Sequence, residues 1–280
     1  MHLLPDEGCC VLVLHTAARY GLSGLALEVI DALKSINIVW REHHIAPVIE
    51  AMCYHKEIKE AFMMFDFMRK NSIEHTLAAA FPVLEVIKKD ADTVDEAWGH
   101  LEALREEGHA VDITAFNIVV QAAVAIQDLQ RAIGTYKAAA QLGVKPDIDT
   151  FNILLQACID ARHRDLGDRL LSDMKDAGIR PDTTTYERMV RLCLTQSTYE
   201  DAFFYLEEMK SLAMVPPLIV YDAIIRKLVS VGDTRYTIAL EELKECGYEV
   251  SVRLQSFIAS GGAHNGPEKG SKAAEQVVIL

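Results

Sequence analysis

The sequence ITAFN at residues 113–117 leads to GVKPD at 143–147, and the same outline starts again at once, with IDTFN at 148–152 and GIRPD at 178–182. Five pairs of identical residues are separated by 35 positions: Phe116 and Phe151, Asn117 and Asn152, Gly143 and Gly178, Pro146 and Pro181, and Asp147 and Asp182. Self-similarity at such a period is typical of solenoids built from small helical units. The chain is therefore predicted to be a repeat protein.

Extending this register in both directions divides the chain into seven units. They are residues 7–41, 42–76, 78–112, 113–147, 148–182, 183–217 and 218–251, with Leu77 as one extra residue before the third unit. Residues 1–6 are interpreted as the end of a preceding repeat, since they close on Pro5-Asp6. Residues 252–280 are interpreted as a capping helix followed by a flexible tail, because GGAHNG at 261–266 is typical of a linker.

Each unit has the pattern of two helices. An aromatic anchor near the start of the first helix is expected to be buried: Phe81, Phe116, Phe151, Tyr186 and Tyr221. N-cap oxygens for these helices are expected from Asp149, Thr150 and residues 183–185. The second helix is expected to end at Gly143, Gly178 or Gly247, which can adopt the left-handed conformation of a C-cap. The predicted fold is an all-α superhelix, a solenoid of about seven helix-turn-helix repeats.

A 35-residue unit with an aromatic-Asn pair near its start, Ala and Met on the second helix and Gly-x-x-Pro-Asp at its end resembles the pentatricopeptide repeat family, in a P-type array. The tetratricopeptide unit would instead carry a Trp and a Leu-Gly pair early in its first helix, and these are absent here. The resemblance implies a right-handed α-solenoid superhelix. It covers residues 7–251, with the strongest matches in the two central units.

The resemblance also implies a function: a non-enzymatic, single-stranded RNA-binding adaptor in organellar gene expression, acting in RNA stabilisation, processing or translation. The implied location is the mitochondrial matrix, with the chloroplast as the alternative. In this family one nucleotide meets each repeat, and the fifth and last residues of the repeat contact the base. Carried over, these residues are Asn117 with Asp147 and Asn152 with Asp182, a combination that favours uridine.

Two further residues complete the predicted RNA-binding set: Thr114, the second residue of its unit, and Asp222, the fifth residue of the last unit. The remaining units depart from the family pattern, with the fifth and last residues being Val11/Arg41, Ala46/Thr76, Pro82/Asp112, Glu187/Pro217 and Asp222/Ser251. The side chains of Val, Ala and Pro cannot hydrogen-bond a base, so only a short footprint is expected. An Asn near a helix start can also serve the backbone, and an Asp there can favour the helix dipole, so a structural role for these residues stays open.

The net charge of −13 weighs against nucleic-acid binding, which normally draws on a basic surface. The charge is uneven. Residues 113–182 carry eight Lys or Arg and nine Asp or Glu, whereas residues 78–112 carry three and nine. The alternative function is a protein-binding scaffold in the mitochondrial ribosome or in an organellar assembly complex. Protein partners in a ribonucleoprotein or ribosome-associated complex are expected in either case.

The sequence carries no familiar catalytic motif: no Gly-rich phosphate loop, no HExxH, no Gly-x-Ser-x-Gly and no CxxC. His43 and His44 suggest a metal site, but adjacent helical residues point in different directions, and a solvated helix start is the interpretation. We therefore expect no catalytic residues, no metal, no cofactor and no small-molecule substrate.

No apolar run is long enough for a membrane span. The Phe and Met series at 62–68 is expected to be mostly core, with part of it exposed as a candidate protein-binding surface.

Overall fold

A computed structural model of the chain describes residues 6–74 and 77–262, and this part contains fifteen α-helices and no strand. The helices are α1 (Glu7–Tyr20), α2 (Ser23–Ser35), α3 (Glu42–Tyr54), α4 (Ile58–Lys70), α5 (Leu77–Ile87), α6 (Ala91–Glu106), α7 (Ile113–Ala125), α8 (Leu129–Lys137), α9 (Ile148–Asp160), α10 (Arg164–Asp176), α11 (Thr183–Leu194), α12 (Asp201–Ser211), α13 (Leu218–Val231), α14 (Tyr236–Glu245) and α15 (Val252–Ala259). The predictions for residues 1–5, Thr76 and the tail from 263 to 280 lie outside the described residues.

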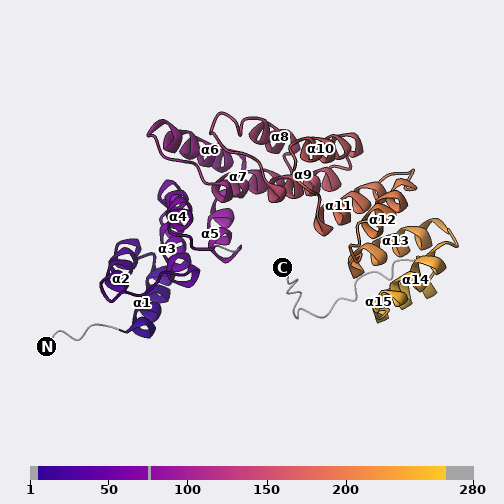
Figure 1. Cartoon of the computed structure of the whole chain (residues 1–280), viewed down its shortest axis with the longest axis horizontal. Coiled ribbons are helices and arrows are strands. Elements are labelled where there is room, and N and C mark those ends of the chain that lie inside the picture. Colours follow the sequence, from indigo (N-terminus) through magenta and orange to yellow (C-terminus); the bar gives the residue numbers. More distant parts are fainter. Residues whose placement is uncertain (1–5, 75–76, 263–280) are drawn as a thin grey trace.

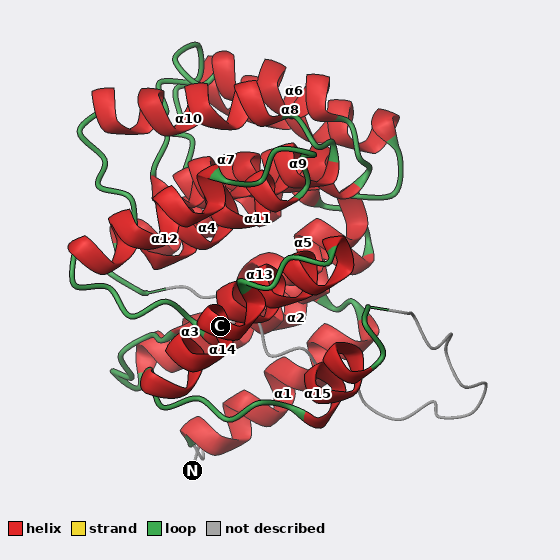
Figure 2. Ribbon diagram, turned by 90° about the vertical axis from the view of Figure 1, so that its right-hand side faces the viewer, coloured by secondary structure: helices red, strands yellow, loops and turns green. Residues whose placement is uncertain are grey.

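The helices form two layers of an arc (Figure 1). Each odd-numbered helix packs against the next odd-numbered helix, from α1 to α15, and this row lines the inner side of the arc. The even-numbered helices pack behind it, and Figure 2 shows α6, α8 and α10 as a separate outer layer. The predicted all-α helical repeat solenoid is therefore confirmed. In the described part, no helix is both long and apolar enough to cross a membrane.

The first helices of the fifth and sixth units, α9 and α11, begin where an aspartate caps them. The side chain of Asp147 accepts a hydrogen bond from the backbone N–H of Thr150 (2.9 Å), and Asp182 does the same for Thr185 (2.7 Å). Both aspartates have extended backbone, which places the carboxylate over the exposed amides of the first turn. The N-cap residue is thus the aspartate one residue before each helix, and not Asp149 or residues 183–184 as predicted. Thr150 and Thr185 do supply oxygens, because each completes a capping box by accepting from the backbone N–H of the capping aspartate (3.1 and 3.3 Å).

The glycines at the ends of the second helices have the predicted left-handed backbone, with φ of 69° at Gly143, 75° at Gly178 and 83° at Gly247. Their helices end earlier than expected. The difference is largest for α8, which ends at Lys137 and is followed by turns up to Gly143 whose hydrogen bonds mostly span three residues. The chain therefore reaches the left-handed glycine through turns and not through regular α-helix.

Four of the five predicted aromatic anchors are buried in the core: Phe116, Phe151, Tyr186 and Tyr221. The fifth, Phe81, is 58% exposed, so this prediction is wrong. The start of α5 explains why. When α5 is counted from its first residue, Leu77, as α7 is counted from Ile113, the place of Phe116 falls on the buried Ala80 and not on Phe81.

The extra residue of the third unit therefore lies between α5 and α6 and not before α5. Ala97 of α6 and Ala132 of α8 are both buried and stay 35 residues apart, so the second helix of this unit keeps the original register. As a consequence Phe81, and not Pro82, occupies the place on α5 that Asn117 occupies on α7. The assignment of Pro82 as the fifth residue of its unit is corrected accordingly.

The aromatic and Met series on α4 is mostly core. Phe62, Phe65 and Met68 are buried, and the ring centroid of Phe67 lies 5.1 Å from that of Trp40. Met63 remains exposed. The hydrophobic stripe of α4 thus packs inside the solenoid, and the candidate protein-binding surface on this helix reduces to Met63 and its immediate surroundings.

Candidate nucleic-acid interface

Asn117 on α7 is tied to the start of α9 by two hydrogen bonds. Its Nδ2 donates to Oδ1 of Asp147 (3.0 Å), and its Oδ1 accepts from the hydroxyl of Thr150 (2.6 Å). Asn117 is only 8% exposed, and Thr150 is fully buried. The structure therefore brings together the two residues that the sequence paired, and it adds a third residue that the sequence analysis had used only as a possible cap.

The next junction repeats this arrangement 35 residues later. Nδ2 of Asn152 on α9 donates to Oδ1 of Asp182 (3.3 Å), and its Oδ1 accepts from the hydroxyl of Thr185 (2.9 Å). Asn152 and Thr185 are buried as well. We call each set, Asn117–Asp147–Thr150 and Asn152–Asp182–Thr185, a junction triad. Each triad joins two neighbouring inner helices.

The aspartate of a triad has two roles, since it caps the helix that follows it and accepts from the amide of the preceding unit. The structural role left open by the sequence is thus present for both Asn and Asp. This structural role leaves part of the hydrogen-bonding capacity of each asparagine amide free, because an amide has two N–H donors and two acceptor lone pairs. One donor and one lone pair of each amide take no part in the triad bonds. This remaining pair is what a base edge could meet.

Thr114 and Asp222, the other predicted site residues, belong to neither triad. Thr114 lies half-buried in the first turn of α7, and its backbone N–H donates to the capping carboxylate of Asp112 (2.8 Å). Asp222 on α13 accepts from two nitrogens of Arg226, at 2.6 and 3.2 Å. The structure therefore places Thr114 beside a helix cap and Asp222 in an ion pair.

Charged side chains gather on the inner helices beyond Asn152. Glu187 of α11 pairs with Arg191 (3.3 Å), and the guanidinium of Arg188 donates to the backbone oxygen of Asn152. Burial lowers the pKa of Arg188. Burial also raises the pKa of Asp149, and the carboxylates of Asp147 and Asp182 raise it further. The start of α9 is thus a place where added negative charge is unfavourable.

The net negative charge lies mainly on the outer helices. On α6 five carboxylates accompany one Arg, and on α12 and on α14 three carboxylates accompany one Lys. The inner helices α11, α13 and α15 together carry five basic side chains and two carboxylates: Arg188, Arg191, Arg226, Lys227 and Arg253 against Glu187 and Asp222. The inner helices α3, α5 and α9, in contrast, carry five carboxylates and no Lys or Arg. A polyanion on the inner side of the arc would therefore meet a favourable field only over α11, α13 and α15.

The corrected register identifies an inner-face residue that sequence reasoning had not assigned to the site. Phe81 exposes its ring from α5 at the place equivalent to Asn117. The sequence pattern could not reveal it, because counts from Leu77 and from Ala78 both align Ala80, Val83 and Ile87 with buried residues of α7.

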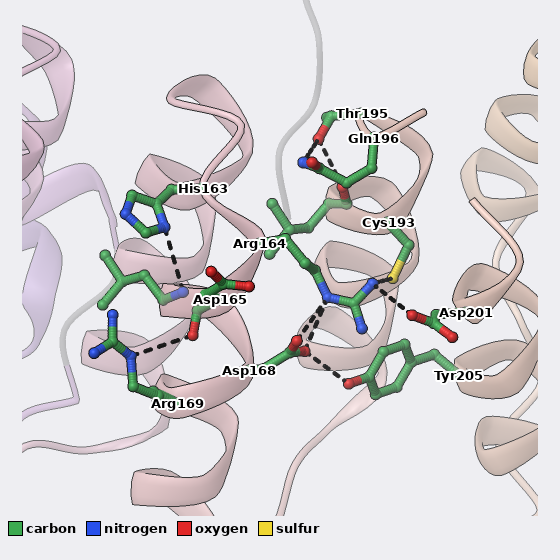
Figure 3. A network of polar contacts seen from close by, with 12 residues as sticks. His163, Arg164, Asp165, Asp168, Arg169, Cys193, Thr195, Gln196, Asp201 and Tyr205 are labelled. Atoms are coloured by element: carbon green, nitrogen blue, oxygen red, sulfur yellow. Dashed lines mark hydrogen bonds and ion pairs between the residues drawn. The ribbon is translucent and has the colours of Figure 1, made fainter. Parts of the chain in front are cut away.

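A polar network on the outer side joins the fifth and sixth units, and Figure 3 shows it around Arg164. The guanidinium of Arg164 donates to both carboxylate oxygens of Asp168 (2.9 Å each) and to Sγ of Cys193 (2.7 Å), while Tyr205 donates its hydroxyl proton to Asp168 (3.1 Å). Burial raises the pKa of Cys193 to about 12, so its thiol stays protonated. The network has the chemistry of a structural tie and not of a nucleophilic site.

The histidine pair on α3 differs from the predicted solvated helix start. His43 is exposed, but His44 is fully buried, and Glu7 of α1 lies 3.3 Å from its Nε2. Nδ1 of His44 accepts from the backbone N–H of Arg41 (3.2 Å), so in the neutral ring Nε2 carries the proton. A metal at Nε2 would need the lone pair that this proton occupies. The arrangement therefore fits an interhelical contact to Glu7 better than a metal site, although Glu7, His43 and His44 lie close enough for one.

Comparisons with known proteins support the fold. A family model described as pentatricopeptide repeat-containing protein matches residues 7–139, and a second, described as PPR repeat family, matches residues 146–195. No curated protein matches the chain by sequence. The chain is similar to the crystal structure of the pentatricopeptide repeat protein PPR10 from maize, with 22% identity and a TM-score of 0.51 over 94% of this chain and 38% of PPR10. The chain thus spans well under half the length of PPR10.

A second similar structure is the PPR domain of Arabidopsis thaliana protein-only RNase P 1, solved in complex with tRNA. The identity is 18% and the TM-score is 0.52, over 64% of this chain and 94% of that domain. At these identities the likeness concerns the fold. Two family models and two structural neighbours thus agree on the same kind of repeat along most of the chain.

Proposed function

Because the chain belongs to the pentatricopeptide repeat family, we propose that it binds single-stranded RNA along the inner side of its solenoid, with about one nucleotide at each repeat. The observation that carries this proposal is the pair of junction triads in successive units. Each triad holds an amide in a defined orientation between two inner helices, and each leaves one donor and one acceptor of that amide for a base.

The two triads favour adjacent uridines. The Watson–Crick edge of uracil presents an N–H donor flanked by carbonyl acceptors, and the free N–H or the free lone pair of the amide can meet this edge with one hydrogen bond. Because Asn117 and Asn152 occupy the same place in successive repeats, their bases would be neighbours along the strand. The specific part of the footprint is therefore two nucleotides long.

Phe81 extends this footprint without adding base specificity. Its exposed ring lies one unit before Asn117, at the same place on its helix. Aromatic side chains in single-strand binding proteins stack on bases of any kind, and each contributes about 1–3 kcal/mol. We expect the nucleotide next to the uridine pair to stack on Phe81.

The finer parts of the proposal rest on the family resemblance. The protein would act as a non-enzymatic adaptor in the mitochondrial matrix, or in the chloroplast, during RNA stabilisation, processing or translation. Fusing a fluorescent protein to the C-terminus of the full gene product and imaging it with organelle markers tests the location. A diffuse or nuclear signal would contradict the organellar role.

The acidic outer helices favour a second, compatible function as a protein-binding scaffold. Carboxylates dominate α6, α12 and α14, so a basic partner such as a ribosomal protein could dock on the outer layer while the inner side stays available for RNA. Membership of a mitochondrial ribosome or of an assembly complex would take this form. Affinity purification of the tagged full-length protein from isolated organelles, with and without RNase, tests it.

RNA binding itself can be tested by fluorescence anisotropy with labelled oligo-U of about ten nucleotides, since seven repeats hold about seven bases. Single-stranded RNA should bind, whereas a duplex of the same length should not. The variant Arg191→Glu/Arg226→Glu places negative charge on inner helices α11 and α13 and should abolish binding. The variant Lys137→Glu/Arg169→Glu makes the same change in charge on outer helices α8 and α10 and should bind nearly as the wild type does.

Two results would contradict the proposal. Binding that is absent at low salt removes direct RNA recognition by this chain and leaves the scaffold function. Binding that both charge variants lose equally would place the RNA somewhere other than the inner side.

A further inference from the structure

Thr150 and Thr185 hold the two asparagines in place, and no family resemblance assigns them a role. We infer that both are positioning residues, which determine the edge that the amides of Asn117 and Asn152 present to a base. This inference rests on the proposed RNA-binding function and deepens it. It concerns how base preference arises in this chain and not whether RNA binds.

The hydrogen bonds of Thr150 show where its hydroxyl proton lies. Oγ1 of Thr150 accepts from the backbone N–H of Asp147 (3.1 Å), so its own proton is left for an acceptor. Two acceptors lie nearby, Oδ1 of Asn117 at 2.6 Å and Oδ1 of Asp147 at 2.9 Å. The shorter contact is the one to Asn117. The hydroxyl therefore identifies the amide atom next to it as oxygen.

The amide of Asn117 has two possible orientations, which differ by a half-turn that exchanges Oδ1 and Nδ2. Rotating the amide of Asn117 by a half-turn would bring its Nδ2 toward the threonine and its Oδ1 toward the carboxylate of Asp147. Two oxygens, one of them charged, would then face each other, and the hydroxyl would keep only the carboxylate of Asp147 as its acceptor. The carboxylate and the hydroxyl thus act together to exclude the rotated amide, and with it the exchanged pattern of donor and acceptor.

Thr150 and Thr185 are fully buried beneath the asparagines, so neither side chain can touch RNA. Any effect of these hydroxyls on base preference has to pass through the amides. In the second triad the hydroxyl of Thr185 lies 2.9 Å from Asn152 and 2.8 Å from Asp182, so it is shared more evenly. We expect Thr150 to have the larger effect.

The neighbouring junctions show what happens where the threonine is missing. Ala115 stands in its place after Asp112, and there the carboxylate caps Thr114 and pairs with Arg69 (3.3 Å). After Pro217 the place is taken by Val220. At neither junction does the residue in the place of the asparagine, Phe81 or Glu187, carry an amide. Threonine and asparagine thus occur together at the two central junctions.

The test compares Thr150→Val/Thr185→Val with Thr150→Ser/Thr185→Ser. Valine keeps the shape and removes the hydroxyl, whereas serine keeps the hydroxyl. The ratio of affinities for oligo-U and oligo-A should fall about fivefold in the Val variant, the loss expected for one net hydrogen bond. The Ser variant should keep the wild-type ratio. A thermal melt of each variant reports folding independently of RNA.

A second pair of variants tests the inference by gain of function, should the Val variant not fold. Phe81→Asn alone introduces an amide without its threonine, and Phe81→Asn/Ala115→Thr supplies both beside the existing Asp112. Only the double variant should gain affinity for an RNA in which a third uridine adjoins the pair.

The possible results separate the two claims. A wild-type uridine preference that survives in the folded Val variant, or an equal gain in the single and double variants at Phe81, overturns the inference and leaves the proposed function intact. No binding of oligo-U by the wild type overturns the proposed function, and the inference falls with it.

Discussion

The amides of Asn117 and Asn152 are each held to the next unit by two hydrogen bonds. Each is buried against the next unit by a carboxylate and a hydroxyl, yet each keeps hydrogen-bonding capacity to spare. Each asparagine therefore serves both the packing of the junction and the proposed base contact. The effect of a substitution there has to be measured on the free energy of unfolding as well as on RNA affinity.

Asn117→Ala should lower the free energy of unfolding by about 1–2 kcal/mol, because two buried hydrogen bonds are lost while Asp147 and Thr150 keep each other as partners. Urea denaturation followed by circular dichroism measures this. Gln121→Ala, one turn further along α7 and half-buried, is the matched control and should change stability by less than about 0.5 kcal/mol. Equal losses in the two variants would show that the triad does not stabilise the junction.

Asp149→Asn should raise both stability and RNA affinity at neutral pH. The folded protein raises the pKa of Asp149 through burial and through Asp147 and Asp182, so the ionised form is disfavoured in the folded state. A carboxyl of this kind contributes stability below its unfolded pKa of about 4, and that contribution is lost as pH rises through the folded pKa. The advantage of Asn is therefore present at pH 7 and absent near pH 4.

The measurement for Asp149→Asn is the melting temperature across this pH range. The gain at neutral pH should be on the order of 1 °C, since the side chain is partly in solvent. RNA affinity should rise a few-fold, because one negative charge leaves the inner side. A gain in melting temperature that is the same at pH 4 and pH 7 would point to packing and not to charge.

The repeat period of 35 residues predicted the order of the helices but not the residue at which every helix begins. Helices α7, α9 and α11 begin at Ile113, Ile148 and Thr183, the first residues of the predicted units. In the third unit Leu77 was assigned to the linker, because the period of 35 residues anchors on Gly-x-x-Pro-Asp and cannot locate an insertion inside a unit. The start of α5 at Leu77, one residue before the predicted start of the unit, locates it between α5 and α6.

The junction triads illustrate the same limit for the site. Asn117 and Asp147 are 30 residues apart, and the family pattern paired them, but nothing in their spacing indicated that Thr150 would reach Asn117. That contact depends on how closely α7 and α9 pack. Interactions across a repeat junction are set by helix packing, which the periodicity of the sequence does not specify.

The corrected register carries a prediction for α5. Phe81→Ala should weaken oligo-U binding by about 1–3 kcal/mol, that is, roughly fivefold to more than a hundredfold, while the melting temperature stays close to wild type because the ring is exposed. Phe116→Ala, the buried counterpart on α7, should instead cost about 3–5 kcal/mol of stability. Unchanged affinity in Phe81→Ala would mean that this ring lies outside the RNA path.

Over the whole molecule, charge is divided between the layers of the arc, with excess carboxylates on the outer helices and basic side chains on α11, α13 and α15. This division predicts a weak dependence of RNA affinity on salt. With about three phosphates contacted, the slope of log K against log salt should be about −2, since each contact contributes about −0.7 for a single strand. Anisotropy titrations over a range of KCl concentrations give this slope. A value several times steeper would indicate a basic surface that the inner helices do not provide.

The most direct test of the central claim uses one RNA, an oligoadenosine carrying a single UU step, and compares it with the all-adenosine strand. Wild type should bind the UU strand more tightly, and moving the step along the strand should move the bound register with it. Asn117→Ala/Asn152→Ala, checked by a melt to be folded, should bind both strands with the same affinity. A double variant that is folded and still prefers the UU strand would contradict the account, because base recognition would then lie outside the two junction triads.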